Sequence, residues 1–173
     1  MPEKKKEIKK PEKSKKTHKP RLTEKPKFNA AIILILIYIG LSIIGNIQNL
    51  FTRLGIIGPI IFTGIPALIF YLFLTLVFVA LFIGIIKRKE WGRDLGIFLY
   101  IILLVWGIVN TLFLLINPSL VERVIAITVG NQPGAEIAAA LFVPMSIISV
   151  IIGSIINILI IWYLHKRKDF FTN

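Results

Sequence analysis

The 173-residue chain contains four long stretches without a single formally charged residue, at positions 28–52, 54–86, 95–121 and 137–164. They are 25, 33, 27 and 28 residues long. A helix needs about 20 apolar residues to cross a hydrocarbon core of roughly 30 Å, and in lipid the backbone must satisfy its own hydrogen bonds. We therefore predict an all-α membrane protein. Its four transmembrane helices, at about 30–50, 65–86, 95–116 and 140–164, are expected to form an antiparallel bundle.

The overall composition points the same way. The chain is 55% hydrophobic and 17% charged, whereas soluble domains are about 45–50% apolar and about 25% charged. A compact soluble protein of this length could not bury so many apolar residues in its core. The chain has no cysteine, which excludes a disulfide framework, a thiolate metal site and cysteine-based catalysis.

The second charge-free stretch is too long for one crossing. At 1.5 Å per residue, 33 helical residues would reach about 50 Å. Glycine and proline cluster in its first third, at Gly55, Gly58, Pro59, Gly64 and Pro66. We therefore predict that residues 51–64 form an apolar, non-helical or broken connection at the membrane surface, with a shallow re-entrant loop as the alternative.

The basic residues predict the orientation. Residues 1–28 carry a net charge of +8 and four prolines, so we predict a disordered, lysine-rich cytoplasmic tail. Nineteen of the 21 basic residues fall in this tail, at 87–93 or at 166–168, and the other side of the membrane receives only Arg53 and Arg123. Because positive charge stays in the cytoplasm, both termini are predicted to lie inside a multi-pass cell-membrane protein. The transmembrane domain would span 29–168, followed by a short cytoplasmic C-terminus at 169–173.

Two shorter segments carry local signals. Phe170 and Phe171 follow a basic cluster and are expected to fold back into the headgroup layer. Asn117 followed by Pro118 is a good N-cap and first-turn pair. We expect a short helix after it on the outer surface, a spacer with Glu122 and Arg123 facing water.

The predicted spans contain no acidic or basic side chain and no histidine. This argues against a proton-coupled pump and against a voltage sensor, which need ionisable groups at membrane depth. His18 and His165 are the two histidines of the sequence, and they lie outside the spans, so we expect no haem or metal centre. There is no phosphate-binding loop, paired carboxylate or nucleophile motif. We expect no catalytic residue, cofactor or metal, and do not predict an enzyme.

Amide side chains inside the spans are the remaining polar candidates. Asn46 lies near the outer end of the first helix, Asn110 in the third and Asn157 in the fourth. Such groups commonly hydrogen-bond between helices. Asn110 and Asn157 are expected at different depths, so we do not expect them to pair. Interhelical contact is the favoured interpretation, and a path for a solute is the alternative.

Small residues recur on one face of the last helix. Ser149, Gly153 and Asn157 are spaced by four residues, which places them on the same side. Small residues let another backbone approach closely. We favour packing inside the chain, with contact to another subunit as the alternative. Gly92 and Gly96 also form a G-x-x-x-G pattern, but charged residues lie between them, so we give it little weight as a dimer motif.

These features lead to a function prediction that rests on contacts. We predict a non-catalytic packing or accessory subunit acting through helix–helix contacts, with a homo-oligomer or another membrane protein as its partner. The alternative is a component of a transporter or channel for a neutral or apolar solute. Membrane lipids are the expected partner of the basic tail, near anionic headgroups. Nucleic acid is not expected there, because the tail has no aromatic side chain before Phe28 on which bases could stack.

Overall fold

The computed structural model describes residues 28–128 and 135–171, and most of this part of the chain is helical. Its elements in chain order are α1 (Ala30–Thr52), β1 (Leu54–Ile57), β2 (Ile60–Thr63), α2 (Ile65–Ile86), α3 (Glu90–Ile116), α4 (Pro118–Thr128), α5 (Ala135–Lys166) and the 3-10 turn η1 (Lys168–Phe170). The predicted disorder of the tail concerns residues that, apart from Phe28, lie outside the described range. Residues 172–173 of the predicted cytoplasmic C-terminus also lie outside it.

The four predicted apolar helices are confirmed. Within the described residues, α1, α2, α3 and the Ala140–Lys166 part of α5 are long and apolar enough to cross a membrane. Three of these helices are longer than predicted: α1 continues to Thr52, two residues into the predicted connection, α3 begins at Glu90, and α5 extends from Ala135 to Lys166. Hydropathy marks only the portion that lipid requires to be apolar, and a helix can continue beyond it into water.

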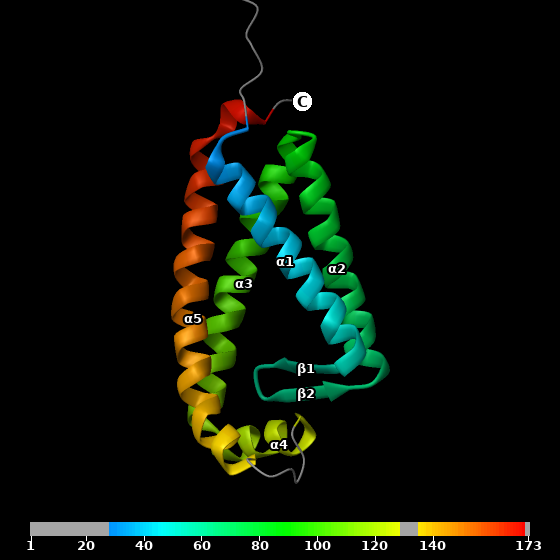
Figure 1. Ribbon diagram of the computed structural model, residues 1–173, viewed down its shortest axis with the longest axis vertical. Helices are drawn as coiled ribbons and strands as arrows, with labels where there is room; N and C mark the ends of the chain where they lie inside the picture. The colour runs from blue at the N-terminus through cyan, green and yellow to red at the C-terminus, as the bar shows by residue number, and fades with distance from the viewer. Residues whose placement is uncertain (1–27, 129–134, 172–173) are drawn as a thin grey trace, which may run out of the picture.

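The helices are arranged as neighbouring antiparallel pairs (Figure 1). α1 packs along α2, α3 packs along α5, and α2 contacts α3. The start of α1, the connection between α2 and α3, and the end of α5 lie at one end of the molecule, which we call the terminal end. The β-hairpin and α4 lie at the opposite end, which we call the hairpin end. The predicted basic segments at 87–93 and 166–168 therefore gather at the terminal end.

Residues 51–64 are more ordered than the sequence predicted. β1 and β2 form an antiparallel hairpin in which Leu54 pairs with Thr63 and Ile57 with Ile60. The two-residue turn begins at Gly58, whose φ is +56°, as the tight turns of hairpins require. The amide of Gly64 donates to the carbonyl of Arg53 at 3.0 Å and closes the hairpin onto α1. The predicted break in the helix is present, but the isoleucines between the glycines and prolines form strands.

The predicted short helix after Asn117 is confirmed as α4, which lies across the hairpin end (Figure 1). It buries Leu120, Val121, Val124 and Ile125 and leaves Glu122 and Arg123 exposed. The expected N-cap role of Asn117 is not what the side chain does. Its amide donates back to the carbonyl of Phe113 at 3.2 Å and so satisfies the last turn of α3.

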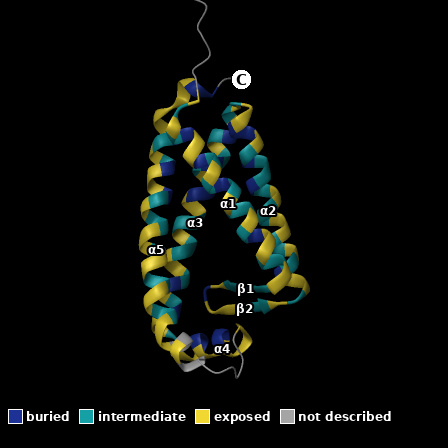
Figure 2. Ribbon diagram, viewed as in Figure 1, coloured by how far each residue is buried: buried dark blue, intermediate teal, exposed yellow. Residues whose placement is uncertain are grey.

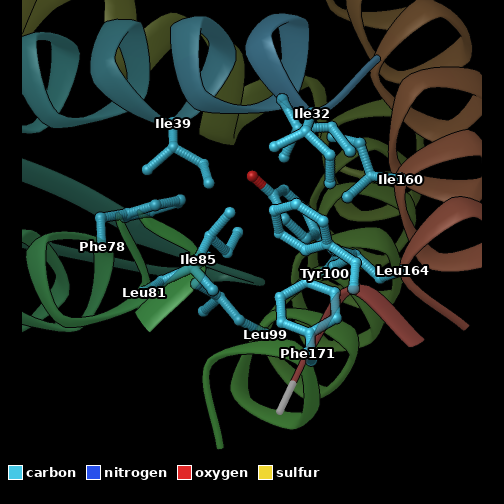
Figure 3. Packing of buried hydrophobic residues seen from close by; sticks show 12 residues of the cluster. Ile32, Ile39, Phe78, Leu81, Ile85, Leu99, Tyr100, Ile160, Leu164 and Phe171 are labelled. Atoms are coloured by element: carbon cyan, nitrogen blue, oxygen red, sulfur yellow. The ribbon is translucent and has the colours of Figure 1, made fainter. Parts of the chain in front are cut away.

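The largest cluster of buried apolar side chains lies in the half of the molecule near the terminal end. Figure 3 shows side chains from α1, α2, α3 and α5 converging around Tyr100, among them Ile39, Leu81 and Leu164. Phe170 and Phe171 belong to the same cluster and are 4% and 3% exposed. These two rings, expected in the headgroup layer, therefore pack against the protein itself.

Large apolar side chains also cover the outside of the helices. Exposed positions run along the length of α5 and down α2 (Figure 2), and they include many isoleucines, leucines and phenylalanines. Soluble monomers rarely expose contiguous apolar patches of more than a few hundred Å². A surface of this kind supports a membrane location.

Candidate functional site

A large cleft lies between α2 and α3. Its volume is about 580 Å³, within the range of about 300–1,000 Å³ typical of ligand pockets. The first strand of the hairpin closes one end. The walls are mostly apolar and aromatic: Leu54, Ile56, Phe70, Tyr71, Phe73, Leu74, Val77, Leu95, Phe98, Leu99, Ile102, Leu103, Trp106 and Asn110. We call this the α2–α3 cleft.

Glycines explain why the backbones of α2 and α3 come close together at one end only. A Cβ on Gly92 of α3 would lie 2.7 Å from the Cα of Gly84 on α2, and one on Gly96 would lie 3.1 Å from Cδ1 of Leu81. Toward the hairpin the helices diverge (Figure 1), and large rings lie between them. The ring centroids of Phe70 and Trp106 are 5.3 Å apart. The cleft therefore results from small residues near the terminal end and large ones farther along.

The sequence alone did not reveal this role of the glycines. It suggested Gly92 and Gly96 only as a weak contact between two copies of the chain. In the structure Gly92 packs against α2 of the same chain, and Gly96 packs against Leu164 of α5 and Leu81 of α2. The signal that could have identified this is Gly84, which lies on the other side of the short connection at 87–89.

Asn110 fixes the hairpin over the cleft. Its side-chain oxygen accepts a hydrogen bond from the amide of Gly58 at 2.6 Å, and its Nδ2 donates to the carbonyl of Ile56 at 3.2 Å. The residue was predicted to join helices, whereas it joins a helix to the turn of a hairpin. The amide of Gly58 and the carbonyl of Ile56 both gain a hydrogen-bond partner in this way. This matters because an unpaired backbone group is costly in lipid.

The other two predicted asparagines lie elsewhere. Asn46 is buried and donates to the carbonyl of Ser42, one turn back in its own helix, at 2.8 Å. Asn157 is 8% exposed, and its Oδ1 has no hydrogen-bond partner among the described residues. Neither residue lines the α2–α3 cleft or a second hollow that lies between α3 and α5. The three asparagines therefore do not line a common wall.

A second hollow lies between α3 and α5, with a volume of about 370 Å³. Several of its lining residues are small or carry a hydroxyl group. They are Gly107, Asn110, Thr111, Leu114, Phe142, Met145, Ser146, Ser149 and Val150. We call this the α3–α5 groove. The hydroxyl of Ser146 donates to the carbonyl of Phe142 at 2.7 Å, and Ser149 is exposed.

Gly153 lies one turn beyond the groove on α5. No heavy atom from another part of the described chain lies within 4 Å of where its Cβ would be. Close approach of another backbone at this position, the role favoured from the sequence, is therefore absent within the described residues. Contact with another subunit is the alternative that the geometry leaves open for Gly153.

The terminal end is held together by an arginine between two rings. The guanidinium of Arg88 lies 4.7 Å from the ring centre of Phe28 and 4.9 Å from that of Phe170, distances at which cation–π attraction operates. Arg88 has φ +55°, and the amide of Lys89 donates to the carbonyl of Gly84 at 2.9 Å. This is the hydrogen bond of a Schellman motif, which ends α2.

The charged groups in the described ranges offer little for chemistry. No group of three His, Asp or Glu residues in those ranges is arranged to hold a metal ion. Arg93 pairs with Asp94 at 2.8 Å near the start of α3. The α2–α3 cleft is lined mainly by apolar side chains, and the α3–α5 groove by apolar, small and hydroxyl-bearing ones. Comparisons of the chain with models of protein families, with curated proteins and with solved structures gave no match.

Proposed function

We propose that this chain is a non-catalytic integral membrane protein that works as a packing or accessory subunit. The α3–α5 groove is the observation that carries the proposal. In this proposal it receives a transmembrane helix of a partner subunit, either a second copy of the chain or another membrane protein. Both termini, with the basic terminal end, lie in the cytoplasm.

The chemistry of the groove supports a helix as its occupant. Lipid provides no hydrophobic drive for helix association, so helices associate through close packing and hydrogen bonds, at surfaces rich in Gly, Ser and Thr. Gly107, Thr111 and Ser149 supply these residue types along the groove. Gly153 continues the same face of α5 with open space in front of it.

The proposed orientation is supported by where the charges gather. The basic residues at 87–89 and 166–168 lie at the terminal end, and Arg53 and Arg123 lie at the hairpin end. A cytoplasmic excess of lysine and arginine is the usual determinant of topology. The proposal therefore places the hairpin and α4 on the outer side of the cell membrane.

The alternative function, a transport component for a neutral or apolar solute, has less support. It relied on Asn46, Asn110 and Asn157 lining a common path. Asn46 bonds within its own helix and Asn110 is engaged by the hairpin. We therefore favour the contact function.

The size of the complex in a mild detergent tests the proposal. Gly153→Ile and Ser149→Leu add bulk on the proposed contact face, and Ile151→Phe adds bulk on the opposite face of α5 as the matched control. We expect wild type and Ile151→Phe to migrate on native gels as a complex, and the other two variants to migrate as monomers. All four should keep the same melting temperature, because Gly153 has open space at its Cβ position and Ser149 and Ile151 are exposed.

A single size for all four proteins would contradict the proposal. If the complex does form, mass spectrometry of the gel band distinguishes a second copy from a different protein. Loss of the complex together with a lowered melting temperature would place Gly153 inside the fold of the monomer, and this too would contradict the proposed role.

A further inference from the structure

The α2–α3 cleft runs along the helices for most of a membrane's thickness. On α3 it extends from Leu95 to Asn110, which is about 22 Å by helical rise. This exceeds the roughly 15 Å that one leaflet contributes to the hydrocarbon core. The cleft is therefore long enough to take an entire acyl chain lying parallel to the helices.

The cleft opens outward, toward the surface that faces lipid. Phe73 and Phe98 line it from α2 and α3 and are 65% and 63% exposed. Ile102, also in the wall, is 40% exposed. A lipid chain can thus enter from the side without passing through the protein.

Exposed cations lie near the end of the cleft that is closest to the terminal end. Leu95 is six residues beyond Lys89, a distance of about 9 Å along α3. Lys87 and Lys89 are both exposed, whereas Arg88 is stacked between two rings. Arg93 is paired with Asp94, and Glu90 adds a second negative charge. The segment at 87–94 keeps a net charge of +2.

We infer that the α2–α3 cleft binds one acyl chain of an anionic phospholipid, whose phosphate lies against Lys87 and Lys89. The apolar walls receive the chain, and the basic connection between the same two helices selects the charge of the headgroup. The hairpin, held by Asn110, closes the far end. Asn110 lines both this site and the α3–α5 groove, but the two share no other lining residue, and the inference does not depend on the proposed function.

Native mass spectrometry of the full chain tests this site. The protein in detergent is titrated with phosphatidylglycerol or with phosphatidylcholine carrying the same two oleoyl chains. We expect one phosphatidylglycerol to bind in preference to phosphatidylcholine. Replacing both lysines (Lys87→Gln with Lys89→Gln) should weaken phosphatidylglycerol binding by about fivefold for each lysine and leave phosphatidylcholine binding unchanged.

A second pair of variants tests the cleft itself, independently of the basic tail. Ile102→Trp fills the cleft, whereas Ile108→Trp adds the same ring to an exposed position of α3 outside its walls. We expect the first to abolish the bound phosphatidylglycerol and the second to keep it, with equal melting temperatures. Binding that survives Ile102→Trp would overturn the inference. So would equal binding of the two lipids, which would point to a neutral apolar occupant.

Discussion

Gly84 on α2 and Gly92 on α3 lie so close that a Cβ added to Gly92 would be 2.7 Å from the Cα of Gly84. Both residues are buried and face each other across the connection at 87–89. The atoms nearest to the Cβ position of Gly92 are backbone atoms of Gly84, which cannot move aside as a flexible side chain can. The distance between α2 and α3 at the terminal end, and hence the shape of the α2–α3 cleft, therefore depends on these two glycines.

Gly92→Ala should destabilise the protein. The added methyl group overlaps the backbone of α2, and overpacking of this kind costs about 1–3 kcal/mol. Gly45→Ala is the matched control, because no heavy atom lies within 4 Å of its Cβ position and alanine favours the helix. Thermal unfolding in detergent measures both. Equal melting temperatures for the two variants would show that α2 and α3 do not pack tightly at these glycines.

The membrane helices could be predicted from the sequence because the constraint that lipid imposes is local. Each charge-free stretch by itself predicts a helix, whatever the rest of the chain does. The charges between the stretches predict which helix ends lie on the same side. The short helix α4 could also be predicted from a local signal, because Asn117 and Pro118 mark its start. The role of the Asn117 side chain was harder to predict, because its side-chain amide group can hydrogen-bond either to the last turn of α3 or to the first turn of α4.

The contacts between distant residues could not be predicted in this way. Asn110 and Gly58 are 52 positions apart, and the isolated sequence indicates only that each is polar or flexible. The hairpin at 54–63 was missed because an apolar run with glycine and proline indicates only a break in a helix. Whether the segments on either side of the break pair as strands depends on the geometry of the turn between them. The packing of Gly92 was missed because its neighbour, Gly84, lies in another helix.

Asn110→Leu should release the hairpin and leave the helices in place. The substitution removes the hydrogen bonds to the amide of Gly58 and the carbonyl of Ile56, each contributing about 0.6 kcal/mol and up to about 2 in a membrane protein. Hydrogen exchange should become faster at residues 54–63 and stay unchanged in α1 and α5. Gln48→Leu, at an exposed position of α1, serves as the control. Unchanged exchange at Gly58 in Asn110→Leu would contradict the role given to Asn110.

The orientation of the chain can be tested by labelling single cysteines, because the sequence contains none. Asp169→Cys lies at the terminal end and Glu122→Cys lies on α4, and both side chains are exposed. In right-side-out vesicles, a membrane-impermeant maleimide should label Glu122→Cys and spare Asp169→Cys. Inverted vesicles should give the opposite pattern. Labelling of Asp169→Cys from outside would reverse the proposed topology.

Removing the hydroxyl group from two different tyrosines should change stability in opposite directions. The Tyr100 hydroxyl is buried and finds no hydrogen-bond partner within residues 28–128 and 135–171, and Figure 3 shows its oxygen between Ile32 and Ile39. Because an unsatisfied buried polar group costs about 1–3 kcal/mol, Tyr100→Phe should raise the melting temperature.

Tyr163→Phe is the matched comparison, since its hydroxyl donates to Oδ1 of Asn29 at 2.6 Å. That oxygen also accepts the amide of Ile32 at 3.1 Å and so keeps a partner when the hydroxyl is lost. We expect Tyr163→Phe to lower the free energy of unfolding by about 0.5–1.5 kcal/mol, the net contribution of an ordinary hydrogen bond. Unfolding of both variants in the same detergent gives the comparison. If Tyr100→Phe were destabilised as much as Tyr163→Phe, the Tyr100 hydroxyl would have to be hydrogen-bonded in the folded protein. That result would contradict the placement of this hydroxyl without a polar partner.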